Sequence, residues 1–189
     1  MYRVGPLGRL NAADKMATPL AQQEYEIYQQ VRGGAVIEGT LFYHYARLVE
    51  DLYAVERARQ ILEDPEVLSR DILCTGRVTN HEGVGVLEAP RGTLFHHYWV
   101  DDNGQLERVN LIVATGNNNW AMSRAVEEVA KRYVDGANIK EGALNRIEAA
   151  IRAYDPCLSC STHALGQMPL ELVILDAAGR ELRRVAAAH

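Results

Sequence analysis

Apolar residues recur at the three- and four-residue spacing of a helix face in three stretches of the chain: 36–62, 117–134 and 141–154. For the first stretch, the spacing predicts a buried face made of Leu41, Tyr45, Leu48, Leu52, Val55 and Leu62. The third stretch is expected to end at Asp155-Pro156, because proline disfavours a helical conformation in the residue before it. A further helix is expected to begin after Thr18-Pro19, where threonine can cap and proline suits the first turn.

The pattern changes to that of strands between Val84 and Val113. The segments VGVLEA, TLFHHYWV and LERVNLIVA are rich in β-forming residues, and DDNG before the last of them is typical of a hairpin turn. Because neighbours in a strand face opposite sides, His96 and His97 are not expected to share one metal ion. Near the end, PLELVILDAAGRELRRV predicts a strand, a glycine turn and a second strand. We therefore expect an α+β fold, dominated by helices, with a small antiparallel β-sheet.

Length and composition are those of a folded globular chain, and the net charge disfavours two classes of partner. The 189 residues are enough to bury a core, and 48% hydrophobic and 24% charged residues are ordinary proportions. The 20 basic and 25 acidic side chains give a net charge of −5, which disfavours nucleic acid and anionic membranes as partners. No apolar run approaches the roughly 20 residues that span a bilayer, and residues 1–10 lack the order of a signal peptide. The expected location is the cytoplasm.

The segment DPCLSCSTH carries the most specific chemistry in the chain. Its C-x-x-C spacing brings the sulfurs of Cys157 and Cys160 within reach of one metal ion, and thiolates favour zinc, iron, copper or nickel. One interpretation is a structural zinc site that adds His163 and the distant Cys74. Two cysteines with no ligand role remain an alternative. A thioredoxin-type redox pair is disfavoured because that motif opens a helix, and haem attachment is excluded because Ser161 stands where histidine is needed.

Four segments in order, YRVGPLGRLN, EAPRGTLFHHYW, NLIVATGNNN and DPCLSCSTHALGQMPL, together resemble one known family. The chain is similar to the large, catalytic subunit of nickel-iron hydrogenases, most closely the cytoplasmic NAD-reducing bidirectional group. The resemblance covers essentially the whole chain from Tyr2 onward but corresponds to the C-terminal part of that subunit. It implies the C-terminal part of the large-subunit fold.

The resemblance implies a nickel-iron centre. In such enzymes four cysteine thiolates hold nickel, and two of them bridge to an iron ion that also carries carbon monoxide and cyanide. By this resemblance Cys157 is a terminal nickel ligand and Cys160 a bridge between the metals. His163 binds a magnesium ion beside the centre or lies at the mature C-terminus, and the alternative is a turn histidine with no ligand role.

The same resemblance assigns roles around the open face of the metals. By this resemblance, Arg91 holds its guanidinium above that face. A fixed charge at low dielectric there favours the splitting of hydrogen into hydride and proton. Asp155 lies beside Arg91 around the same face. Pro90 and Thr115 cradle the diatomic ligands of iron, Thr115 by donating a hydrogen bond to a cyanide. Each residue also has an ordinary alternative: a surface ion pair for Arg91, a turn for Asp155 and a strand-to-helix turn for Thr115.

Several parts of such an enzyme are expected in other chain segments. The family's other two cysteines lie in an R-x-C-G-x-C motif, which this sequence lacks, so the chain alone is expected to show little hydrogenase activity. The implied partners are the N-terminal part of the large subunit, NAD/flavin diaphorase subunits and an iron-sulfur small subunit. No G-x-G-x-x-G fingerprint occurs, so this chain is expected to bind neither NAD nor flavin.

The resemblance also divides the chain. Residues 1–163 correspond to the cluster-binding part, and residues 164–189 to an extension that a maturation endopeptidase removes. The alternative is that LELVILD is a permanent edge strand. The function implied is reversible H2 oxidation coupled to NAD reduction through partner subunits. The rival hypothesis is a non-enzymatic remnant or a zinc-stabilised assembly module.

Overall fold

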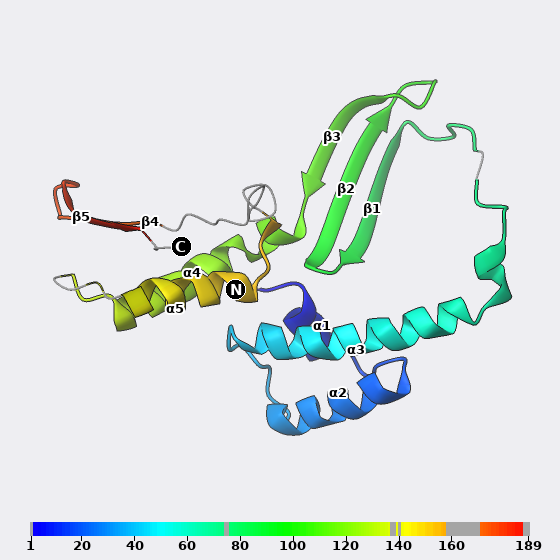
Figure 1. The fold of residues 1–189 in the computed structure, drawn as a ribbon. Helices are drawn as coiled ribbons and strands as arrows, with labels where there is room; N and C mark the ends of the chain where they lie inside the picture. Colours follow the sequence, from blue (N-terminus) through cyan, green and yellow to red (C-terminus); the bar gives the residue numbers. More distant parts are fainter. Residues whose placement is uncertain (1, 74–75, 137–138, 140, 158–170, 187–189) are drawn as a thin grey trace. The chain divides into compact units, whose positions relative to one another are not determined.

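The computed structural model describes residues 2–73, 76–136, 139, 141–157 and 171–186 (Figure 1). The chain forms two compact units. We call Val4–Ala114 the sheet unit, and Met1–Arg3 together with Thr115–His189 the tail unit. None of the helices in these described ranges has the length and apolar content needed to cross a membrane.

The sheet unit contains three α-helices, a short 3-10 helix and a three-stranded antiparallel sheet. Its elements are α1 (Pro6–Ala12), α2 (Pro19–Arg32), α3 (Phe42–Leu62), η1 (Pro65–Leu68), β1 (Glu82–Ala89), β2 (Gly92–Val100) and β3 (Leu106–Ile112). The strands are ordered β1-β2-β3 (Figure 1). At the DDNG turn the Asp101 carboxylate accepts the amides of Asn103 and Gln105 at 2.9 and 2.8 Å. The predicted strands and hairpin turn are confirmed.

The core of the sheet unit lies where α1 and α2 meet α3. Its fully buried side chains are Leu7, Leu10, Ala21, Tyr25, Tyr28, Tyr43, Ala46 and Val49. The rings of Tyr25 and Tyr28 stack with their centres 6.2 Å apart. Burying a large apolar side chain contributes about 1.5–3 kcal/mol of transfer free energy to folding. This core includes the seven-residue α1, which the sequence pattern did not predict.

The predicted helix over 36–62 is confirmed from Phe42 onward, but its predicted buried face is wrong. Of that face, Leu41, Leu48, Val55 and Leu62 are exposed and Tyr45 and Leu52 are half-buried, whereas the buried residues are Tyr43, Ala46 and Val49. The reason is tertiary: α1 and α2 both pack on the side of α3 that carries these three residues. The apolar spacing of α3 alone cannot indicate which side its neighbours cover.

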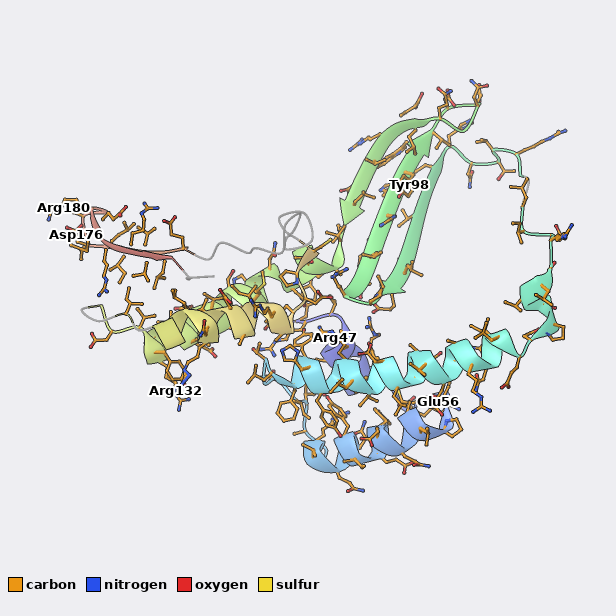
Figure 2. All side chains as sticks on the ribbon, viewed as in Figure 1. Arg47, Glu56, Tyr98, Arg132, Asp176 and Arg180 are labelled. Atoms are coloured by element: carbon orange, nitrogen blue, oxygen red, sulfur yellow. The ribbon has the colours of Figure 1, made fainter. Side chains whose placement is uncertain are left out.

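The amino end of α2 is capped by a side chain of α3. The Glu56 carboxylate accepts the Leu20 amide at 3.1 Å and the Ala21 amide at 2.9 Å (Figure 2). The Thr18 side chain makes no capping hydrogen bond, so that prediction is wrong. Desolvation raises the pKa of Glu56, but the hydrogen bonds from Ala21 and Leu20 outweigh it, and the pKa lies below its ordinary value.

This lowered pKa predicts a pH-dependent docking of α2. A carboxylate with a lowered folded pKa stabilises the fold above its unfolded pKa, about 4.5, and loses that contribution as the pH falls through the folded value. We expect Glu56→Gln to lower the midpoint of thermal unfolding at about pH 7 and to differ less from the wild type below about pH 4. Circular dichroism melts across this pH range measure both effects.

The matched control is Glu63→Gln, at the C-cap of the same helix. Glu63 pairs with Arg59 at 3.1 Å, but their side chains are 65% and 82% exposed, and such a pair contributes little. Its melting midpoint should follow that of the wild type at every pH. A Glu56→Gln deficit that does not shrink in acid would contradict capping by the ionised carboxylate.

The tail unit is built around two antiparallel helices, α4 (Ala114–Tyr133) and α5 (Glu141–Ala153). At one end the Arg146 guanidinium lies 4.4 Å from the ring centre of Tyr133. At the other end Thr115, in the first turn of α4, accepts a hydrogen bond from the amide of Cys157, which lies beyond the end of α5. Small residues on both helices are buried, namely Ala121, Ala125, Ala143 and Ala150. The helical spacing of this segment predicts a buried face of Leu144, Ile147, Ile151 and Tyr154 on α5. Three of these are buried and Ile151 is half-buried.

A two-stranded hairpin, β4 (Glu171–Leu175) and β5 (Glu181–Ala186), completes the described part of the tail unit. Its turn is closed by Asp176, which accepts the amides of Ala178 and Arg180 and pairs with the Arg180 side chain at 2.7 Å (Figure 2). Arg184 on β5 contacts the carboxylates of Glu171 and Glu181, each at 2.7 Å. The predicted strand-turn-strand is confirmed.

Candidate metal centre

Cys157 follows a sharp reversal at the end of α5. The Asp155 amide donates to the Arg152 carbonyl at 3.0 Å, and Asp155 itself has a φ of 49°, in the left-handed region. Aspartate is one of the few residues that tolerate this conformation, which stops the helix before Pro156. Pro156 is buried and Cys157 is exposed. The turn, in which Asp155 lies, therefore presents the thiol at the surface of the tail unit.

Thr115 holds the backbone of Cys157 in place. Thr115 lies in the first turn of α4 and is buried, and its Oγ1 accepts the amide of Cys157 at 2.9 Å. A hydroxyl can accept and donate at once, so this bond leaves the hydroxyl proton available for a second partner. The structure thus brings together two of the predicted site residues, separated by 42 positions in the sequence.

Pro90 and Arg91 form the tight turn between β1 and β2 in the sheet unit. Ala89 pairs with Gly92 across this turn, Pro90 is exposed and Arg91 is half-buried. The turn lies against the start of α1, where a side chain on Gly5 would place its Cβ 2.7 Å from the Arg91 carbonyl oxygen. Gly5 and Gly92 have φ values of 91° and 135°, so both close approach and backbone conformation require glycine.

Arg9 is a residue of this region that the sequence pattern did not single out. Its guanidinium bonds Glu50 on α3, Glu88 on β1 and two carbonyls of the turn. Burial lowers the pKa of Arg9, but its hydrogen bonds with Glu50 and Glu88 outweigh burial and raise that pKa above its ordinary value. The only sequence signal was its position within YRVGPLGRLN.

The remaining predicted ligands lie outside the described residues. These are Cys160, His163 and, for the zinc alternative, Cys74. Within the ranges that the structure describes, no three His, Cys, Asp or Glu side chains converge as a metal site. Pro90 and Arg91 belong to the sheet unit, and Thr115, Asp155 and Cys157 belong to the tail unit. The zinc set therefore stays a prediction.

The two neighbouring histidines of β2 bond to different groups. The His97 Nε2 lies 2.7 Å from a Glu82 carboxylate oxygen on β1, and the His96 Nδ1 lies 2.8 Å from the Tyr98 hydroxyl. Successive residues of this regularly paired strand alternate between the sheet faces. The prediction that the pair does not share one metal ion is consistent with these partners.

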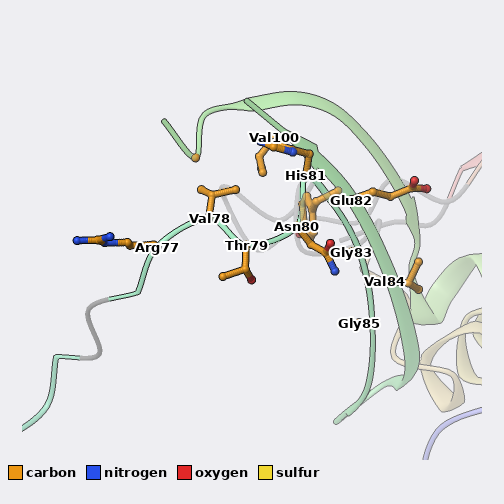
Figure 3. A pocket seen from close by; sticks show the side chains of 12 residues that line it. Arg77, Val78, Thr79, Asn80, His81, Glu82, Gly83, Val84, Gly85 and Val100 are labelled. Atoms are coloured by element: carbon orange, nitrogen blue, oxygen red, sulfur yellow. The ribbon is translucent and has the colours of Figure 1, made fainter. Parts of the chain in front are cut away.

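A hollow beside β1 is distinct from the predicted site. It lies between the segment 77–81 and the strand, where Gly83 and Gly85 leave open the space a side chain would occupy (Figure 3). Its neighbours include Tyr98 and His81, and His81 contacts Asp102 at 2.9 Å. Of the predicted site residues that the structure describes, none lines this hollow.

Comparison with known proteins identifies the family. The sequence model described as nickel-dependent hydrogenase matches residues 1–163. The chain is 49% identical over 94% of its length to the NAD-reducing hydrogenase HoxS subunit beta of Cupriavidus necator. It is 46% identical over 96% of its length to a subunit of the vhc F420-non-reducing hydrogenase of Methanococcus voltae. The chain spans 37% and 39% of the length of those two proteins.

A solved structure agrees with the sequence comparisons. The crystal structure of an NAD+-reducing [NiFe]-hydrogenase in the H2-reduced state superposes with a TM-score of 0.77 at 44% identity, over 86% of this chain and 36% of that one. The expected resemblance and the expected α+β large-subunit fold are confirmed. The chain belongs to the nickel-dependent hydrogenase family.

Proposed function

We propose that this chain supplies half of the thiolate ligands of a nickel-iron centre in the catalytic large subunit of a hydrogenase. The enzyme would couple reversible H2 oxidation to NAD reduction through partner subunits. The observation that carries the proposal is the exposed thiol of Cys157, held at the end of α5 by the 2.9 Å bond between its amide and Thr115. Family membership supplies the metal's identity.

The chemistry of the donors fits the group. Cys157 presents its sulfur outward, and Cys160 follows at the C-x-x-C spacing that lets two thiolates meet one soft metal. Cys157 and Cys160 would hold nickel, Cys160 would also contact iron, and His163 would bind magnesium. The other two thiolates would come from the R-x-C-G-x-C motif of the N-terminal part. When bound, the centre with its carbon monoxide and cyanide ligands supplies the redox chemistry of hydrogen.

The chain's other residues would shape the open side of the centre. Thr115 would accept a hydrogen bond from the Cys157 amide and donate its hydroxyl proton to a cyanide nitrogen. Arg91 would hold a fixed positive charge over the site where hydrogen reacts, and such a preorganised charge acts strongly in a dry pocket. Asp155 would sit beside it and Pro90 would give the diatomic ligands an apolar neighbour. Asp155 stands two residues before Cys157, in the left-handed turn that ends α5.

The electron acceptor and partners are proposed from the relatives. The relative at 49% identity is named NAD-reducing, while that at 46% is named F420-non-reducing, so the identities favour NAD by a narrow margin. Electrons would leave through the iron-sulfur clusters of a small subunit. They would reach NAD in a flavin-containing module, and the whole assembly would lie in the cytoplasm. This chain would bind neither NAD nor flavin.

We further propose that residues 164–189 are an extension that an endopeptidase removes after nickel insertion. Two observations support a boundary after His163. The family match ends at that residue. In the β4–β5 hairpin beyond it, Arg184 on β5 pairs with Glu171 on β4 at 2.7 Å.

The test is metal and acceptor analysis of the assembled protein. The full-length large subunit is co-expressed with its partner subunits and maturation factors, and the purified complex is analysed for nickel, iron and zinc by mass spectrometry. We expect nickel and iron in amounts equal to the large subunit, and hydrogen-dependent reduction of NAD in preference to NADP or F420. Zinc alone, or no metal, would instead favour the non-enzymatic module.

A further inference from the structure

We propose that Arg9 is a positioning residue that aims Arg91. The inference rests on the proposed function of Arg91 above the metal centre, and it concerns only how the protein fixes that guanidinium. Nothing in the spacing of Arg9 relative to Arg91 suggests the connection, because the two are separated by α2, α3, η1 and β1 in the chain.

Each of the five N–H donors of Arg9 has an acceptor. Nε and one Nη2 hydrogen reach the two oxygens of Glu50, each at 2.7 Å, in a bidentate pair. One Nη1 hydrogen reaches Glu88 at 2.8 Å. The other two donors reach the carbonyls of Ala89 and Pro90, at 2.8 and 2.9 Å. The planar fork of arginine is fully used, and lysine cannot reproduce this set.

The anchor of this arrangement is rigid. Glu50 lies in the middle of α3, one residue from the buried Val49, and Arg9 lies in α1 between the buried residues Leu7 and Leu10. The side chains of Arg9 and Glu50 are only 25% and 20% exposed. Charge-assisted bidentate bonds are stronger at such partly buried sites than on the surface. The helical core thus holds the guanidinium in one orientation.

The arrangement fixes the backbone of Arg91 from both sides. Arg9 binds the carbonyl of Pro90, which is the peptide group that leads into Arg91. On the other side, Gly5 packs so closely on the Arg91 carbonyl that no Cβ could be added there. The backbone of Arg91 is therefore held by two independent contacts. One comes from Arg9 on α1, and the other comes from Gly5, which precedes α1. Misplacing a catalytic charge by about 1 Å can reduce a rate about a hundredfold.

A double-mutant cycle separates positioning from general stabilisation. The full-length enzyme is prepared with Arg9→Lys and Arg9→Gln, each alone and combined with Arg91→Lys. Arg9→Lys keeps the charge opposite Glu50 and so preserves folding better than Arg9→Gln. The matched control is Arg59→Gln, which removes an 82% exposed arginine of α3 that pairs with Glu63. Thermal unfolding and nickel content are measured for every variant.

We expect Arg9→Lys to lower kcat for H2 oxidation by about 10- to 100-fold, with KM for H2 and nickel content within about twofold of the wild type. In the Arg91→Lys background the same change should alter kcat by less than about twofold, because it acts through Arg91. Hydrogen exchange at the Arg91 and Gly92 amides should become faster in Arg9→Lys. Arg59→Gln should change none of these values.

The outcomes that overturn the inference are distinct from those that overturn the proposed function. If Arg91→Lys lowers kcat but Arg9→Lys acts equally in both backgrounds, or leaves kcat and amide exchange unchanged, Arg9 is not a positioning residue and the proposed function survives. If Arg91→Lys leaves kcat unchanged, the catalytic role of Arg91 fails and the positioning role fails with it.

Discussion

Replacing Cys157 with serine in the assembled enzyme should remove nickel and hydrogen oxidation together while the tail unit stays folded. Serine is a hard donor whose hydroxyl stays protonated near neutral pH, so it cannot substitute for a thiolate on a soft metal. Loss of an outer-shell partner already costs about 10- to 100-fold in metal affinity, and loss of a direct ligand should exceed that. The fold should tolerate the change because the side chain is exposed and Thr115 bonds only the backbone amide.

The measurements are nickel content, hydrogen-dependent dye reduction and circular dichroism. Cys74→Ser is the informative control, because Cys74 belongs only to the zinc alternative. The nickel hypothesis expects Cys74→Ser to keep metal and activity, whereas a zinc site of Cys157, Cys160, His163 and Cys74 would lose its metal in either variant. A Cys157→Ser enzyme that retains nickel and full activity would contradict the proposed ligand role.

The second large effect is expected at Gly92. An alanine Cβ there would lie 2.4 Å from Val4 Cγ2 and 2.8 Å from the Gly5 nitrogen, at a φ of 135°. Backbone strain and overpacking each cost about 1–3 kcal/mol, so Gly92→Ala should lower the free energy of unfolding by about 3 kcal/mol or more. Val4→Ala should not rescue it, since the Val4 Cβ and the Gly5 backbone remain in the way.

Urea unfolding followed by circular dichroism measures this loss. Gly85→Ala provides the matched control: it lies in the neighbouring strand, where an added Cβ meets nothing within 4 Å. Its free energy of unfolding should stay within about 1 kcal/mol of the wild type. Equal losses for Gly92→Ala and Gly85→Ala would contradict the close packing of the Pro90–Arg91 turn on the start of α1.

The sequence pattern predicted the type and order of most elements but not which surfaces meet. Strands β1 to β5 and helices α2 to α5 follow from periodicity and turn residues, which are local properties. Two features depended on distant segments instead. Helix α1 is short and is stabilised by packing against α3, and the buried face of α3 is set by α1 and α2 rather than by its own apolar spacing.

The candidate site was predictable where its chemistry is contiguous. The C-x-x-C spacing marks Cys157, and Asp155-Pro156 marks the turn that presents it. The supports of these residues were not predictable from spacing. Thr115 meets Cys157 across 42 positions, and Arg9 meets Pro90 across 81. Such pairs are recognised only in the folded structure, because a hydrogen bond between distant residues produces no periodic pattern in the sequence.

The bond from the Cys157 amide to Thr115 has a consequence for the order of assembly. It can form only after the two helices of the tail unit have closed on each other, since its partners stand at the far ends of that hairpin. During synthesis Thr115 leaves the ribosome well before Cys157, so α4 cannot pair with α5 until α5 has also emerged. The backbone of Cys157 is thus fixed against the start of α4 only late in folding, once both helices are paired.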